Sequence, residues 1–284
     1  FQREFETPIL GGSESTAERL GERVGPFLLR RRKDQVAEDL PDKVEMDEWV
    51  ELSDEQRQLY VTIQNRQAEP LRRSLAAGAQ MNYPGILAIL TKLKQVCDHP
   101  ALVTGRFDPI EERSDKFDRI LELIEEIVDQ EEHAVLFTQW LDALNLFQKA
   151  LNRRGIRWVR LDGSVPMRIR QQRIDHFNER KVDVALCSLQ AMGHGVNLTA
   201  ANHVIHVDRW WNPAIEDQAT DRLHRIGQTR TVFVHHIQAS DTLEEKIAEL
   251  QEKKRGMSDR IMRAADRPMK WTREELLELL KPLE

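Results

Sequence analysis

The sequence predicts an α/β protein: a parallel sheet with helices on both faces, preceded by a mostly helical part. From about Ser114 onward, short apolar segments alternate with amphipathic segments of about 10–15 residues, the pattern of successive βαβ units. Before that point, apolar residues recur at helical spacing and no alternating strand pattern interrupts them. The most distinctive segments directly follow the predicted strands, at the sheet edge where α/β proteins bind ligands.

The first part of the chain contains two predicted helical regions. Residues 53–56, SDEQ, form a capping box in which the Ser and Gln side chains bind each other's backbone N–H groups. A long helical pattern continues to Leu75, and Pro70 is expected to kink or split it. Residues 84–100 form a second, apolar-rich helix bounded by prolines.

Strands and helices alternate regularly in the second part. The strands are predicted at 133–138, 156–161, 182–188, 203–208 and 231–237. The helices are predicted at 115–130, 140–155, 165–178, 213–227 and 242–255. Gly155 is expected to end the helix 140–155, and the helix 213–227 is expected to begin at Pro213 and to end at Gly227.

Composition limits the class of protein. The chain has 284 residues, enough for one large domain or two modest ones, and its net charge is −6. Cys97 and Cys187 form no disulfide framework, which fits a reducing cytoplasm. No apolar run approaches the ~18 residues of a membrane span, and no signal peptide is recognisable, so no membrane partner is expected. The chain begins without Met, which indicates a fragment.

The charges are unevenly distributed. Acidic residues dominate residues 111–132, whereas arginines dominate residues 153–180. For the basic group RRRK at 30–33 we favour a solvated surface. For the longer arginine segment, phosphate contact and a solvated surface remain equally open.

The glycines exclude one kind of nucleotide site. No Gly is followed by Lys, so the phosphate-binding loop G-x-x-x-x-G-K-[ST] is absent and the chain cannot by itself bind a nucleoside triphosphate in that way. Gly193 and Gly195 follow a predicted strand; they allow close backbone approach to a phosphate or ribose, although a tight turn is the alternative. His203 and His206 would point to opposite faces of a strand, so no metal site is predicted.

Three polar residues suggest an anion site. Gln218, Arg222 and Arg225 fall at positions i, i+4 and i+7 of the predicted helix 213–227, which would place them on one face. Asp217 and Asp221 are expected on other faces of that helix. Because polar groups on a core-side stripe are costly without a partner, we favour an external anion over pairing within the chain.

The segment 208–230, DRWWNPAIEDQATDRLHRIGQTR, resembles the last motif of the Swi/Snf-type ATPases, double-stranded-DNA translocases of helicase superfamily two. The resemblance covers almost the whole chain, with the family's motifs in order. The other matching segments are GPFLLRRRKDQVAEDLPDK, LAILTKLKQVCDHPAL, AVLFTQWLDALNLF, RLDGSVPMRIRQQRIDHFN and VALCSLQAMGHGVNLTAANHVIHVD. The family usually has Lys-Ala-Gly-Gly where this chain has Gln190-Ala191-Met192-Gly193.

The resemblance implies a RecA-like fold and three parts of the chain. Residues 1–114 would be the helical protrusion and a linker from the first motor lobe, 115–250 the helicase C-terminal lobe, and 251–284 a helical extension. ATP and Mg²⁺ would be bound mainly by the missing first lobe, with no cofactor expected in this fragment alone.

The resemblance also implies roles for individual residues. Arg222 and Arg225 would be arginine fingers that meet the γ-phosphate, organised by Gln218. Nucleotide contacts would involve Gly193, Gly195 and Asn197. The residues in motifs that face the DNA backbone are Gln139, Arg168, Ser188, Trp210, Trp211 and Asn212.

The function expected on these grounds is the second motor lobe of an ATP-dependent double-stranded-DNA translocase, a DNA-dependent ATPase when complete but inert as this fragment. Its partners would be duplex DNA, the first lobe and an unknown protein target. A non-catalytic interaction module and an RNA helicase lobe are the alternatives. The expected location is the cytoplasm, at the nucleoid in a bacterium, or the nucleus in a eukaryote.

Overall fold

The computed structural model describes residues 40–80, 82–191, 196–258 and 272–282, with scattered residues between 2 and 23 that include a π-helical turn, η1 (Gln2–Glu6). Its centre is a six-stranded sheet in the order β1-β6-β5-β2-β4-β3, and every pair is parallel. The strands are β1 (Lys43–Val50), β2 (Ala134–Thr138), β3 (Trp158–Leu161), β4 (Val184–Ser188), β5 (His203–His206) and β6 (Val232–Ala239). All five predicted strands are present, and the predicted α/β class is confirmed.

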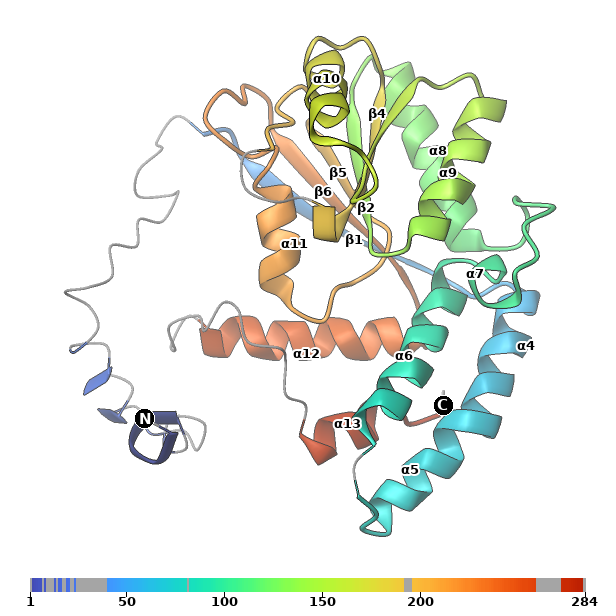
Figure 1. The fold of residues 1–284 in the computed structure, drawn as a ribbon, viewed down its shortest axis with the longest axis vertical. Coiled ribbons are helices and arrows are strands. Elements are labelled where there is room, and N and C mark those ends of the chain that lie inside the picture. The colour runs from blue at the N-terminus through green and yellow to red at the C-terminus, as the bar shows by residue number, and fades with distance from the viewer. Residues whose placement is uncertain are drawn as a thin grey trace.

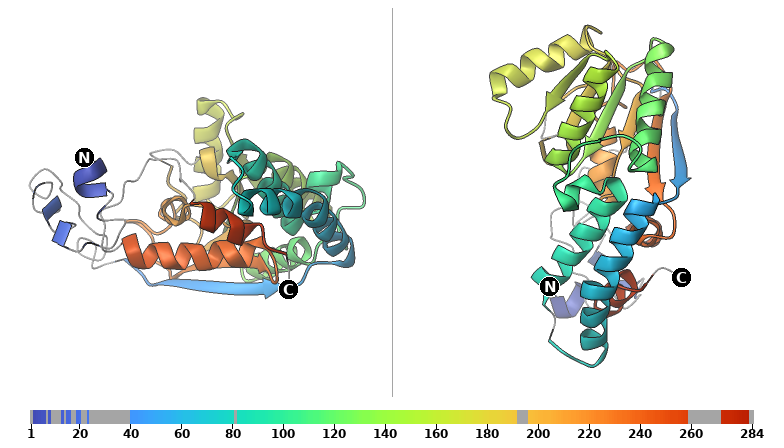
Figure 2. Two further views of the ribbon diagram at one scale, coloured as in Figure 1. Left: turned by 90° about the horizontal axis from the view of Figure 1, so that it is seen from below. Right: turned by 90° about the vertical axis from the view of Figure 1, so that its right-hand side faces the viewer.

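Helices cover both faces of the sheet, as predicted (Figures 1 and 2). On one face lie α8 (Asp115–Asp129) and α9 (Leu141–Arg153), and on the other lie α10 (Met167–Asn178) and α11 (Pro213–Thr220). Alternate residues of a strand serve alternate faces: Leu136 belongs to the core beneath α8 and α9, and Phe137 to the core beneath α10 and α11. A 3₁₀ turn, η4 (Leu189–Ala191), follows β4.

A separate group of helices lies beside one end of the sheet (Figures 1 and 2) and has its own buried core. It contains α4 (Asp54–Ile63), the π-helical segment η3 (Gln64–Ala68), α5 (Glu69–Ala76), α6 (Tyr83–Asp98), α7 (Ala101–Thr104), α12 (Leu243–Ser258) and α13 (Arg273–Leu279). The capping box at Ser53 is confirmed, and Pro70 lies in the first turn of α5, so the long helix is split there as predicted. We call these elements the helical part.

Strand β1 was not predicted from the sequence. It is an edge strand that pairs only with β6, and most of its side chains are exposed. An edge strand needs no continuous apolar run, and three acidic residues, Glu45, Asp47 and Glu48, break up its apolar pattern. The sheet therefore includes a strand from residues 1–114, the segment predicted to hold the helical protrusion and a linker.

The predicted helix 213–227 is wrong in its second half. Helix α11 ends at Thr220, and turns follow it. Contacts with the segment after β4 hold these turns: Leu198 N–H donates to the Arg222 carbonyl (3.0 Å), and Gln228 Nε2 donates to the Ala201 carbonyl (2.7 Å). Gln218 and Arg222 therefore do not share a helix face. We call residues 221–228 the arginine turn.

Among the residues that the structure describes, no helix is long and apolar enough to cross a membrane. Cys187 is fully buried in the core, as its place on a predicted strand suggested, and so is Cys97 on α6.

Candidate functional site

The carboxyl ends of β5, β2 and β4 lie side by side in the middle of the sheet. Thr138 and Ser188, the last residues of β2 and β4, are register partners. The chain crosses here from the β3–β4 side of the sheet to the β5–β6 side, and α/β proteins bind ligands at such switch points. The segments after these strands are therefore brought to one edge, as the sequence predicted.

The guanidinium of Arg222 has no counter-ion among the described residues. Arg222 is only 9% exposed, and its Nε atom is buried without a hydrogen-bond partner. Burial lowers the pKa of Arg222, and the positive charge of Arg225 lowers it further, against the attraction of Asp221. A desolvated cation is costly unless an anion meets it. The arrangement is suited to an anion supplied from outside the described part of the chain.

Arg225 and Asn197 lie close to this cation. Arg225 is half-buried, and its Nη1 donates to the Val196 carbonyl at 3.3 Å. The side chain of Asn197 is exposed between Val196 and Leu198, whose N–H holds the Arg222 carbonyl. The structure thus brings Arg222, Arg225 and Asn197 together. Gln218 is exposed on α11, and Gly193 and Gly195 lie outside the described residues.

The loop between β3 and α10 carries a fixed carboxylate. Burial alone would raise the pKa of Asp162, but hydrogen bonds from Ser164 and the Arg160 guanidinium outweigh it, so the pKa is lowered. Arg170 donates to the Asp162 carbonyl (2.6 Å) and to the Ala191 carbonyl (3.0 Å), which ties this loop to η4.

Two of the residues predicted to face DNA lie near this loop. Arg168 is exposed on the first turn of α10, where it can meet a ligand. Ser188, by contrast, is buried at the end of β4, with only 6% of its surface exposed.

Residues 210–212, which we call the tryptophan turn, pack against two different buried cores. Trp210 packs against the core beneath α10 and α11, whereas Trp211 packs against the helical part. Asn212 caps α11 by accepting a hydrogen bond from Ala214 N–H (3.1 Å). All three side chains are partly exposed.

Two buried residues that the sequence reasoning missed support this turn. Glu216 accepts from the Trp210 backbone N–H, and Gln251 of α12 donates to both the Trp210 carbonyl and Glu216. Burial raises the pKa of Glu216, although the nearby Arg209 guanidinium opposes the shift.

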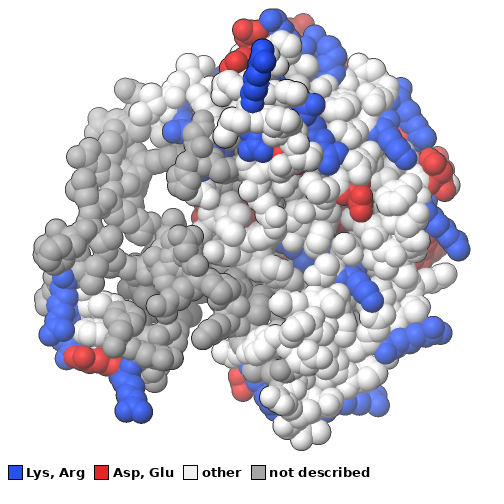
Figure 3. Space-filling view, viewed as in Figure 1, with Lys and Arg blue, Asp and Glu red and all other residues white. Residues whose placement is uncertain are grey.

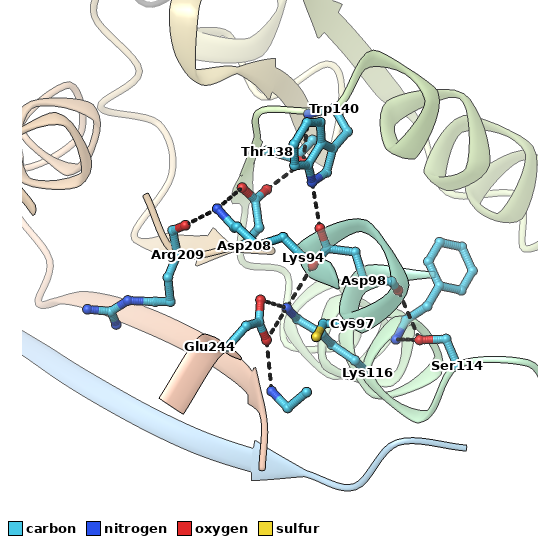
Figure 4. A network of polar contacts seen from close by, with 12 residues as sticks. Lys94, Cys97, Asp98, Ser114, Lys116, Thr138, Trp140, Asp208, Arg209 and Glu244 are labelled. Atoms are coloured by element: carbon cyan, nitrogen blue, oxygen red, sulfur yellow. Dashed lines mark hydrogen bonds and ion pairs between the residues drawn. The ribbon is translucent and has the colours of Figure 1, made fainter. Parts of the chain in front are cut away.

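Asp208, at the end of the segment after β5, is a structural acceptor (Figure 4). Its Oδ1 accepts from Thr138 Oγ1 (2.7 Å) and from the Gln139 backbone N–H (3.1 Å), and its Oδ2 accepts from the Gln139 side chain. Gln139, a residue predicted to face DNA, is therefore turned towards Asp208. Within the described ranges, no group of three or more His, Cys, Asp or Glu residues could hold a metal ion.

The histidines that the sequence assigned to the sheet pair with each other. His203 Nδ1 lies 3.0 Å from His235 Nε2, and the rings of His206 and His236 stack with centroids 5.1 Å apart.

Lys and Arg side chains are spread over the upper and right-hand parts of the face shown in Figure 3, with a few acidic side chains among them.

Comparison with known proteins matches both parts of the chain to protein families. The model of the helicase conserved C-terminal domain matches residues 115–227, and that of the SNF2-related domain matches residues 1–102. The sheet and its helices therefore have the RecA-like fold of a helicase conserved C-terminal domain.

Two solved structures and one curated relative are similar to this chain, and the first of them is covered almost completely. The SWI2/SNF2 ATPase C-terminal domain of Sulfolobus solfataricus is 33% identical, with a TM-score of 0.63 over 79% of this chain and 92% of that one. The SWI2/SNF2 ATPase core from the same organism, in complex with dsDNA, is 37% identical, with a TM-score of 0.65 over 90% of this chain and 54% of that one. An uncharacterized ATP-dependent helicase of Mycoplasma pneumoniae is 38% identical over 92% of this chain and 25% of its own length. The chain belongs to the SWI2/SNF2 ATPase family.

The chain spans 23% to 31% of the length of the first three curated relatives that it matches.

Proposed function

We propose that this chain is the second motor lobe of an ATP-dependent double-stranded-DNA translocase. It supplies Arg222 and Arg225 to the γ-phosphate of an ATP that the first lobe holds, and alone it does not hydrolyse ATP. The observation that carries the proposal is the buried Arg222 guanidinium without a counter-ion in the described part of the chain, with Arg225 in the same turn.

The chemistry assigned to the two arginines is electrostatic. As the γ-phosphoryl group is transferred, negative charge develops on its oxygens, and a positioned guanidinium stabilises that charge. The guanidinium of Arg222 is already largely buried, and its backbone is held through its carbonyl, so the residue stands at a defined place in the turn. ATP and Mg²⁺ are assigned to the first lobe because no Gly in this chain is followed by Lys.

Duplex DNA is the proposed track. The similar archaeal ATPase core was solved in complex with dsDNA. In this chain, exposed Arg168 and the partly exposed Trp211 and Gln139 lie in the segments that follow the strands. Contacts to the DNA backbone carry no base-sequence information, and each phosphate contact makes binding weaken as salt rises.

The experiment that tests this function compares three nucleic acids. The ATPase rate of the complete protein is measured with duplex DNA, single-stranded DNA and RNA at equal nucleotide concentrations, beside a sample of this chain alone. We expect the strongest stimulation by duplex DNA and no hydrolysis by this chain alone. Stronger stimulation by RNA would identify an RNA helicase lobe instead, and no hydrolysis by the complete protein would contradict the motor function.

A further inference from the structure

We propose that Lys94 is a positioning residue through which the helical part sets the orientation of Gln139 and of the Trp140–Trp211 pair at the carboxyl edge of the sheet. The proposal rests on the function proposed above, because it makes Lys94 a determinant of the response to DNA without contact between Lys94 and DNA.

The Lys94 side chain leaves α6 and enters the sheet edge (Figure 4). It is completely buried, its Nζ lies 3.7 Å from Asp208 Oδ2, and it donates to the Arg209 carbonyl. The same ammonium lies 5.0 Å from the ring centroid of Trp211 and 5.9 Å from that of Trp140, within the range of cation–π attraction. One cation thus contacts the segments that follow both β2 and β5.

A second side chain of α6 reaches the same edge. Asp98, one helical turn after Lys94, accepts a hydrogen bond from the indole Nε1–H of Trp140 (2.7 Å). Asp98 also accepts from Lys116 of α8 (2.8 Å), and Lys116 donates to Glu244 of α12 (2.7 Å and 2.9 Å). Asp208 and Asp98 of α6 therefore both bind residues 138–140. Lys116 links Asp98 in turn to α8 and α12.

The choice of residue type supports a positioning role. A buried ion pair generally contributes little net stability, because desolvation offsets the Coulomb attraction, and an apolar residue of similar length packs as well or better. An ammonium, unlike a methyl group, fixes the direction of several acceptors and aromatic faces at once. In this site those partners are Asp208, the Arg209 carbonyl and two indoles, and Asp208 in turn orients Gln139.

A substitution of Lys94 in α6 changes the carboxyl edge of the sheet through Asp208 and the two indoles. Loss of the Lys94 ammonium leaves the Asp208 carboxylate without its cation. It also removes the cation that attracts the rings of Trp140 and Trp211. Gln139 and Trp211 then sample other orientations, and contacts to the DNA backbone are weakened.

The test compares Lys94→Met with Lys92→Met in the complete protein. Lys92 lies two residues earlier on α6, is exposed, and donates only to Gln67 among the described residues (3.1 Å), so it is a matched control. Tryptophan is replaced by 5-fluorotryptophan, and the ¹⁹F resonances of Trp140 and Trp211 are assigned by single Trp→Phe variants. The second readout is the duplex DNA concentration that gives half-maximal ATPase stimulation. If Lys94→Met does not fold, Lys94→Gln replaces it with the same expectations.

We expect Lys94→Met to shift both ¹⁹F resonances and to raise the half-maximal DNA concentration about tenfold, and Lys92→Met to change neither. Unshifted resonances, or an unchanged DNA concentration despite shifted resonances, would overturn the proposal. If duplex DNA does not stimulate the unmodified protein, the proposed function fails and the DNA part of this inference fails with it. The resonances then still decide whether Lys94 positions the two indoles.

Discussion

The backbone N–H of Leu198 donates a hydrogen bond to the carbonyl oxygen of Arg222 over 3.0 Å. This bond joins the segment after β4 to the arginine turn, and the Arg222 N–H donates to the Ala219 carbonyl of α11 (3.0 Å), so the backbone of Arg222 is held from both sides. The Arg222 guanidinium gains no counter-ion within the described residues from this arrangement. A cation that is anchored but not paired has consequences for both stability and activity.

Replacement of Arg222 by Met should not destabilise the protein. The substitution removes a desolvated, unpaired charge and keeps most of the apolar stem, so the free energy of unfolding should stay the same or rise by about 1 kcal/mol. Urea denaturation of the two proteins, followed by circular dichroism, measures the difference.

Arg113→Met is the matched control for this substitution. Arg113 is also 9% exposed, but its guanidinium donates to both carboxylate oxygens of Glu55, at 2.6 Å and 2.8 Å, and to the Arg106 carbonyl at 2.6 Å. Its replacement should therefore cost about 2–3 kcal/mol. Equal losses for Arg113→Met and Arg222→Met would show that Arg222 is a structural residue.

Replacement of Lys116 by Met should be strongly destabilising. The Lys116 ammonium is the shared cation of Asp98 and Glu244, and all three residues are at most 2% exposed. Its loss leaves the Glu244 carboxylate buried without its cation, beside Asp98, whose pKa burial raises to about 8, and this should cost about 3–5 kcal/mol. Thermal and urea unfolding of Lys116→Met can be compared with Lys92→Met, a surface substitution expected to stay within about 0.5 kcal/mol. A loss of less than about 1 kcal/mol for Lys116→Met would contradict this structural role of the Lys116–Glu244 ion pair.

His99 should make stability depend on pH. Burial lowers the pKa of His99 to about 4, and its ring is fixed as a neutral tautomer: Nε2 lies 2.8 Å from the Ile110 carbonyl, and Nδ1 accepts from Ala101 N–H. Between about pH 6.5 and pH 4 the unfolded chain binds the proton more readily, so this contribution to stability is present near pH 7 and is lost as the pH falls.

The His99→Gln substitution isolates this contribution. The difference in unfolding free energy between the unmodified protein and His99→Gln should be about 2–3 kcal/mol smaller at pH 4.5 than at pH 7, at about 1.4 kcal/mol for each pKa unit. His176→Gln, which changes an exposed histidine on α10, is the matched control for the loss of an imidazole. A His99→Gln difference that does not vary with pH would contradict the assigned tautomer.

Much of the fold could be predicted because periodicity is a local signal. All five predicted strands belong to the six-stranded sheet. Three of them, β2, β4 and β5, are buried along their whole length, and their apolar runs reflect this burial. Strand β1 was missed because its pairing depends on β6, far away in the sequence, and its own side chains are mostly exposed. Helix α11 was extended too far because the contacts that end it come from the segment 198–201.

The site could be predicted only in part for a similar reason. Residue type and position predict an anion site at Arg222 and Arg225, but the placement of these residues depends on contacts with Val196 and Leu198, distant in sequence, as well as on the end of α11. Lys94 and Asp98 were overlooked, although their place among the apolar residues of a predicted helix was a signal: charged residues on a buried face need partners. The partners lie far away in the sequence, 115 residues for Lys94 and Arg209 and 42 residues for Asp98 and Trp140, so the sequence could not name them.

The ATPase rate of Arg225→Ala in the complete protein, at saturating ATP and duplex DNA, tests the central claim most directly. Arginine fingers contribute roughly 10³–10⁵ to kcat in other phosphoryl-transfer enzymes, so kcat should fall about 10³-fold or more. Arg153→Ala, which changes an arginine on α9 that is 54% exposed, should keep the full rate. Retention of more than about a tenth of the DNA-stimulated rate by Arg225→Ala, corresponding to a loss of less than about 1.4 kcal/mol of transition-state stabilisation, would contradict the claim that this residue meets the γ-phosphate.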